Sequence, residues 1–180
     1  MSNSFHAELI PPLVRTLHNL SHLLKRAESH ATNAGFPVAV LLSSRLYPDM
    51  FDLTRQVQIS TDISRRGVAR LAGLEAPVME DNETDIQQLQ NRINSSICFI
   101  EGISPEALVG AEQRSIRLPI PSSMGGGERE FSGDDFLRFF VLPNVYFHVT
   151  TAFAILRHNG VRIGKFDYLL GENAPLSPST

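Results

Sequence analysis

The chain has 180 residues, an apolar content of 42% and a formal net charge of −3. A chain of this length can bury a hydrophobic core of its own, and this apolar content excludes general disorder. The net charge excludes the basic footprint that nucleic-acid-binding proteins carry, so no nucleic-acid partner is expected. A single cysteine excludes an internal disulfide and any site built from paired cysteines.

The first residues, MSNSFHAELIPPL, lack the basic and apolar regions of a signal peptide. We therefore predict a cytoplasmic protein. The first helix is predicted from about Phe5 to Thr32, where apolar residues recur at alternating spacings of three and four. This spacing is typical of the seam of a helical bundle.

The second helix is predicted from Asp52 to Ala72, and it has few large apolar residues and many small ones. Its side chains Gln58, Asp62 and Arg65 follow the spacing i, i+4, i+7 and so form a polar stripe along one face. This stripe can either face water or line a polar cavity.

The third helix is predicted to begin near Asn82 or Thr84, since either residue can cap a helix, and to end by Gly102. After it, the segments Arg114 to Pro121 and Glu128 to Phe131 alternate between apolar and polar residues, and they are joined by SSMGGG. We expect two short strands or an extended flap here, with the triple glycine as a mobile tip.

The last helix is predicted to begin at Ser132 or Asp134. From Phe139 to Leu156 it is apolar on nearly every side, which is typical of a helix buried in protein or in lipid. A membrane span needs about 20 strongly apolar residues, and this run includes Pro143 and several polar side chains. We therefore predict burial in protein and no membrane span, with a kink at the proline.

Four long helices and one extended segment predict an all-α fold, an antiparallel four-helix bundle with a short extended excursion before the last helix. One domain is expected over residues 1–171, followed by a loose Pro- and Ser-rich tail over residues 172–180. The last helix has more apolar faces than such a bundle can cover. Because surplus apolar surface usually marks an interface, we predict a homodimer.

Two polar side chains interrupt the apolar last helix. Asn144 and His148 are four residues apart and share one face. Buried polar groups need hydrogen-bond partners, and the second helix offers its polar stripe. The sequence therefore predicts a candidate polar pocket between the second and fourth helices. Its predicted lining is Asn144, His148, Gln58, Asp62, Arg65 and Tyr47.

A second pair of histidines has the spacing of two zinc ligands on one helix. His18 and His22 are again four residues apart, but the apolar seam of the first helix places them on the outward face, beside Arg15 and Lys25. We interpret them as solvent-exposed. The sequence has no nucleophile elbow, phosphate-binding loop, dinucleotide fingerprint or HExxH motif.

Two long segments resemble the DinB/YfiT-like helical bundle proteins, and in particular a bacterial family of unknown function among them. The segments are RLYPDMFDLTRQVQISTDISRRGVARLAG and LPNVYFHVTTAFAILRHNGVRIGKFDYLLG. The resemblance extends over nearly the whole chain and implies a four-helix bundle, often dimeric. It also implies a divalent metal, commonly nickel or zinc, held by one histidine on the second helix and by HxxxH on the last. Characterised relatives include thiol-dependent transferases and isomerases.

Carried onto this sequence, the resemblance places His148 at the second histidine of HxxxH and Asn144 at the first. Gln58 or Asp62 stands where the family has its third histidine ligand, on the second helix. Amide groups are poor ligands for first-row transition metals, and a catalytic zinc uses three protein ligands. We therefore expect no bound metal, although nickel or zinc is what the resemblance alone would imply.

Three interpretations stay open from the sequence. The chain binds a small molecule in the polar pocket with little or no catalysis. Alternatively, it is a thiol-type transferase or hydrolase, metal-dependent or not, with His148 as ligand or general base and Asp62 orienting or coordinating. In the third interpretation, the same polar side chains form a structural network that fixes the register of the helices.

Overall fold

The structure, a computed structural model, describes residues 4–120, 122 and 125–174. The chain is mostly helical, which confirms that part of the predicted fold class. Its helices are α1 (Ser4–Ala34), α2 (Ala39–Leu42), α3 (Leu53–Ala72), α4 (Ile86–Glu101), α5 (Gly133–Phe136), α6 (Leu142–His158) and α7 (Lys165–Leu170). Two strands, β1 (Ile116–Pro119) and β2 (Glu128–Phe131), form a hairpin.

Side-chain caps set where α3 and α4 begin. The carboxylates of Asp52 and Asp85 each accept a hydrogen bond from the backbone N–H three residues later, at 2.9 and 2.8 Å. Such a bond satisfies one of the N–H groups that the first turn of a helix leaves unpaired. The predicted caps of α4, Asn82 and Thr84, were wrong, because both residues precede the residue that makes this bond.

The last helix is divided by a change in helical geometry. Ser132 caps α5, and the backbone then widens into a π-helical segment, Leu137–Val141, that leads directly into α6. Pro143 has no N–H to donate to the carbonyl of Phe139, so one regular helical hydrogen bond is missing here. The wider turn lies where that bond is lost.

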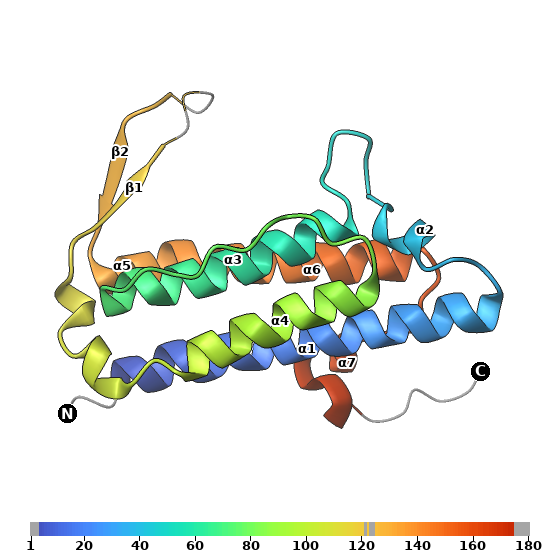
Figure 1. Ribbon diagram of the computed structural model, residues 1–180, viewed down its shortest axis with the longest axis horizontal. Helices are drawn as coiled ribbons and strands as arrows, with labels where there is room; N and C mark the ends of the chain where they lie inside the picture. The colour runs from blue at the N-terminus through green and yellow to red at the C-terminus, as the bar shows by residue number, and fades with distance from the viewer. Residues whose placement is uncertain (1–3, 121, 123–124, 175–180) are drawn as a thin grey trace.

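Four long helices, α1, α3, α4 and α6, lie side by side (Figure 1). α1 is antiparallel to α4, and α3 is antiparallel to α6, whereas α3 and α4 run in the same direction. The connection over residues 74–85 makes this possible, because it runs back along the whole of α3 before α4 begins. The prediction of a fully antiparallel bundle was therefore wrong for this pair.

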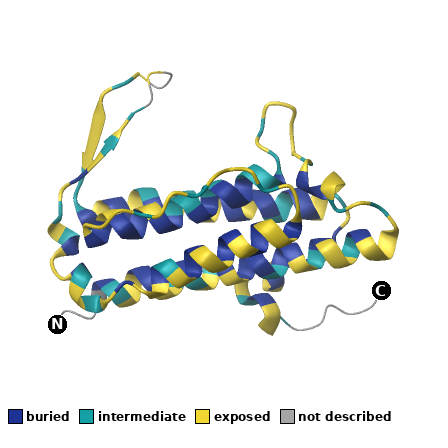
Figure 2. Cartoon of the chain, in the orientation of Figure 1, coloured by how far each residue is buried: buried dark blue, intermediate teal, exposed yellow. Residues whose placement is uncertain are grey.

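The apolar core lies between the long helices (Figure 2). The leucines of α1 form its longest row, and α6 contributes one inward face that includes Val145, Val149 and Ile155. The outward face of the last helix is not covered. Phe139 is 72% exposed and Phe147 is 59% exposed, so the expectation that this helix is buried on every side was wrong.

Within the described residues, one helical stretch, Gly133–His158, is long and apolar enough to cross a membrane by length and composition alone. In its most apolar window, 44% of the residues are buried inside the protein. A helix with one face packed in a core and one face exposed is typical of a soluble helical protein.

The β hairpin confirms the predicted extended excursion before the last helix. Its strands pair antiparallel, with Ile116 opposite Phe131 and Pro119 opposite Glu128. At its base, the backbone of Gly133 touches that of Ala111, so closely that a Cβ on Gly133 would lie 1.8 Å from the carbonyl oxygen of Ala111. Only glycine fits this approach. Residue 121 of the first predicted strand and residues 123 and 124 of the link between the strands lie outside the described residues.

The C-terminal helix α7 packs against the middle of α1. His22 Nε2 lies 2.9 Å from Asp167 Oδ1, and the amide of Asn19 donates to the carbonyl oxygen of Tyr168 at 2.8 Å. Although burial opposes it, hydrogen bonding to His22 lowers the pKa of Asp167. His22 is therefore half-buried and paired, not solvent-exposed as predicted. Of the predicted tail, residues 175–180 lie outside the described residues.

Candidate functional site

His148 lies in the interior between α6 and α3, and a glutamine holds it there. The side chain is 9% exposed, and its Nδ1 lies 2.7 Å from Oε1 of Gln56. Burial, and secondarily the charge of Arg55, lowers the pKa of His148 below its ordinary value of 6.5. The imidazole is therefore neutral near pH 7, and because its partner atom is an amide oxygen, Nδ1 donates the hydrogen bond.

The predicted partners of His148, Gln58 and Asp62, were wrong. The observed partner, Gln56, does come from the predicted second helix. Gln58 and Asp62 turn away from α6 and towards α4 and the connection that precedes it. The amide of Gln58 donates to Glu83 at 2.8 Å, and Asp62 accepts from Arg92 at 2.7 Å. The structure thus brings His148 and Gln56 together, and it places Gln58 and Asp62 in a separate cluster.

This cluster centres on Arg92, a buried arginine of α4. Its guanidinium donates to the hydroxyl of Thr61 at 2.8 Å and to the carboxylates of Glu83, Asp62 and Asp81 at 2.8, 2.7 and 2.9 Å. Although burial opposes it, hydrogen bonding to Glu83 raises the pKa of Arg92. Side chains from α3, α4 and the connection between them are joined by this one cation.

One carboxylate of the cluster is shared by three arginines. Asp62 accepts from Arg65 at 2.8 Å, from Arg92 at 2.7 Å, and pairs with Arg66 at 3.3 Å. Arg65 is 0% exposed, and its Nε and Nη1 have no hydrogen-bond partner among the described residues. Burial lowers the pKa of Arg65, with the charges of Arg92 and Arg66 acting in the same direction. Asp62 therefore supplies the charge compensation that Arg65 needs.

The two remaining predicted site residues lie apart from this cluster. Tyr47 is 65% exposed in the loop before α3. Asn144 is half-buried on α6, one turn before His148. The six predicted site residues therefore do not share one pocket.

The donors around His148 do not fit a nickel or zinc ion. Gln56, which is bonded to Nδ1 of His148, and Asn144, one helical turn before it, both carry amides, which bind such ions poorly. Among the described residues, no group of three or more His, Cys, Asp or Glu side chains is arranged to hold a metal.

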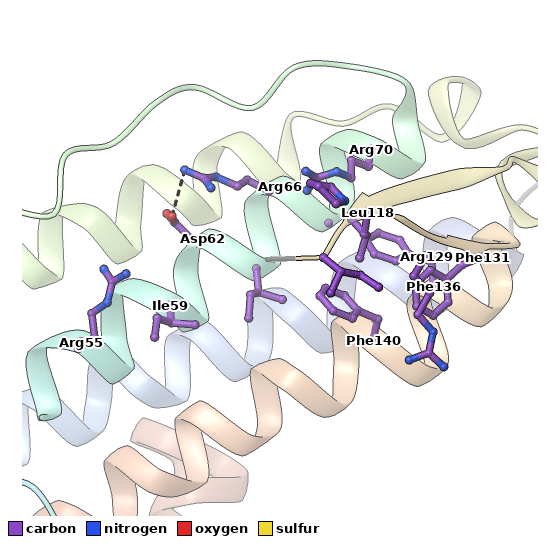
Figure 3. Close-up of a pocket in the computed structure, with 14 residues that line it drawn as sticks. Arg55, Ile59, Asp62, Arg66, Arg70, Leu118, Arg129, Phe131, Phe136 and Phe140 are labelled. Atoms are coloured by element: carbon purple, nitrogen blue, oxygen red, sulfur yellow. Dashed lines mark ion pairs between the residues drawn. The ribbon is translucent and has the colours of Figure 1, made fainter. Parts of the chain in front are cut away.

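A cleft of about 700 Å³ lies on the outer side of α3, where the β hairpin and the start of the last helix meet it (Figure 3). One wall is the face of α3 that carries Ile59, Ile63 and Arg66. The opposite walls are formed by the hairpin and by the segment around the π turn. These walls contribute Leu118, Pro119, Ile120, Arg129, Phe131, Phe136 and Phe140.

The cleft combines an apolar interior with a basic rim. Phe136 and Phe140 stack with their ring centroids 5.3 Å apart, and Phe131 lies 5.9 Å from the first ring. Four arginines and a single acid, Asp62, also line the cleft. Sequence reasoning missed this site. The signal available was the row of Ile59, Ile63, Arg66 and Arg70 along one side of α3, but its partner walls come from a hairpin far along the chain.

Comparison with known proteins places the chain in a family. The profile of a domain of unknown function, DUF1993, matches residues 5–169. The chain belongs to the DUF1993 family. It is also 36% identical to a DinB family member protein from Shewanella denitrificans, whose crystal structure superimposes with a TM-score of 0.84 over 99% of this chain and 96% of that one. No curated protein matches the chain. The predicted likeness to an uncharacterised DinB-like family is confirmed.

For this DUF1993 protein we predict that His148→Ala lowers the free energy of unfolding by about 1–3 kcal/mol, because Oε1 of Gln56 loses its buried partner. The effect depends on pH. Since the pKa is lowered in the folded state, the unfolded chain binds the proton more readily. The contribution of His148 is therefore complete above pH 6.5 and declines as the pH falls towards the folded-state pKa.

Urea denaturation of both proteins at several pH values measures this difference. A loss on His148→Ala that is constant from pH 5 to 8 would contradict a neutral, buried imidazole.

A second prediction for the DUF1993 protein concerns Asp62 and the arginines that share its carboxylate. Asp62→Asn should cost about 3–5 kcal/mol, because it leaves the buried guanidinium of Arg65 without an anionic partner. Arg65→Met should cost far less or stabilise the protein, because Asp62 keeps Arg66 and Arg92 while a desolvated charge is removed. Urea denaturation compares the two variants, and equal losses would show that Arg65 does not depend on Asp62.

Proposed function

We propose that this DUF1993 protein binds a small molecule in the cleft between α3, the β hairpin and the start of the last helix, without a bound metal and with little or no catalysis. The observation that supports this most directly is the cleft itself. Its volume of about 700 Å³ falls in the range that holds small ligands, and its interior is lined mainly by aliphatic and aromatic side chains.

The proposed site differs from the pocket expected from the sequence. Asp62 lines the cleft, but His148 does not. His148 is held by Gln56 in the interior, and none of the described carboxylates lies within hydrogen-bond distance to orient it as a general base. Binding therefore accounts for the arrangement better than a transferase or hydrolase that would use His148 and Asp62 together.

We predict that the neutral dye N-phenyl-1-naphthylamine binds this cleft, with an increase in its fluorescence that saturates at one equivalent. Ile59→Gln should weaken this binding, because it replaces an apolar wall with an amide of similar size. Val109→Gln is the matched control, since Val109 is exposed and does not line the cleft. If both variants bind the dye like the unaltered protein, the dye does not use this cleft and the proposal fails.

We also propose that the protein is a cytoplasmic homodimer, and that the outward face of α6 forms the interface. Tyr146 and Phe147 of α6 are exposed, as is Phe139 of the π-helical segment before it, which gives an aromatic surface of the kind that interfaces favour. A second copy of the chain is the partner that covers it.

Light scattering at micromolar concentration should give the mass of a dimer. Phe147→Glu should give a monomer, because it places a charge in the middle of the apolar face. Val78→Glu should leave the mass unchanged, since Val78 is exposed in the connection between α3 and α4. A monomeric unaltered protein would refute the dimer.

A further inference from the structure

The charge of the cleft differs from the charge of the whole chain. The protein carries a net charge of −3, yet four of the side chains that line the cleft are arginines and one is an acid. Surface charges of one sign gathered in a concave site raise the local concentration of ligands of the opposite sign. The excess of arginine in this cleft therefore favours an anionic ligand.

Two of these arginines, Arg66 and Arg70, lie one turn apart on α3 at the rim of the cleft (Figure 3). Within the described part of the chain, no acid pairs with both of them. Arg66 pairs with Asp62 at 3.3 Å, but the same carboxylate also forms ion pairs with Arg65 and Arg92. Arg70 has no ion pair within 4 Å among the residues that the structure describes, and neither does Glu75 nearby.

The two rim arginines carry like charges that repel each other. Burial lowers the pKa of Arg70, and the charge of Arg66 acts in the same direction. An anion placed between two guanidinium groups would remove this repulsion and accept charge-assisted hydrogen bonds from both.

The opposite end of the cleft is apolar. Phe131, Phe136 and Phe140 form a cluster in which every pair of ring centroids lies within 6.1 Å. Arg129 lies over the outer ring of this cluster, with its Cζ 5.3 Å from the centroid of Phe131. Ile59 and Ile63 of α3 face the same cavity. A ligand that fits both ends has a charged group at the rim and an apolar body inside.

We propose that the ligand of this cleft is an amphipathic anion, a carboxylate or a phosphate ester on an aliphatic or aromatic body. Its head group binds Arg66 and Arg70, and its body packs against Ile59, Ile63 and the phenylalanine cluster. This inference rests on the proposed function, because it names the class of molecule that the same cleft binds.

The test compares ligands that share one body and differ in the head group. Titration calorimetry with octanoate, octyl phosphate, octan-1-ol and octyltrimethylammonium measures how much the charge contributes. We expect at least one anion to bind about ten- to a hundredfold more tightly than the alcohol, as charge-assisted hydrogen bonds predict. The difference should shrink with added salt. The better of the two anions identifies the head group.

The outcomes separate this inference from the proposed function. Equal affinities for the anions and the alcohol, or tighter binding of the ammonium compound, would overturn the anionic ligand and leave small-molecule binding intact. If none of the four compounds binds although N-phenyl-1-naphthylamine does, the anionic ligand is refuted and small-molecule binding still stands. If neither they nor the dye bind, both proposals fail.

Variants test whether the rim arginines carry the preference. The double substitution Arg66→Gln and Arg70→Gln should remove the preference for the anion and leave the affinity for octan-1-ol within about twofold, because the apolar interior is unchanged. Arg157→Gln is the control, since Arg157 is exposed on α6 and does not line the cleft. A double variant that still prefers the anion would refute the assigned head-group site.

Discussion

Arg92 is buried between α3 and α4, and its charge is tolerated there because three carboxylates and a hydroxyl surround it. A buried cation without such partners would cost several kcal/mol. Two of the carboxylates, Asp81 and Glu83, come from the connection between the helices. The same contact that neutralises Arg92 therefore holds this connection along α3 and allows α4 to run in the same direction as α3.

This arrangement determines which partners the side chains on each side of α3 contact. Gln58 and Asp62 are used to compensate Arg55, Arg65 and Arg92, so they are not available to His148. The side of α3 opposite Gln58 carries Gln56, whose amide oxygen accepts a hydrogen bond from the imidazole of His148. The outward side carries the isoleucines and arginines of the cleft. A single helix thus separates a structural charge cluster, an interior hydrogen bond and a candidate binding surface.

Much of this was accessible from the sequence because it depends on local chemistry. The spacing of the apolar residues predicted α1, and the apolar run on both sides of His148 predicted that this side chain is buried and bonded to the second helix. The choice between Gln56 and Gln58 was not accessible, since α3 is polar on two sides and the pattern does not say which side meets α6. The cleft was missed for a related reason: its walls meet only after the hairpin has folded back against α3.

The contact between Gly133 and Ala111 has a consequence for how such proteins diversify. The segment between these residues leaves the helical core and returns to it at the same point, and it supplies one wall of the cleft. Its two ends are fixed against each other by backbone atoms, and Ile116 anchors it in the core, so changes confined to its exposed residues leave the core intact. Grafting a different hairpin between these two anchor points would therefore change one wall of the cleft while the long helices keep their arrangement.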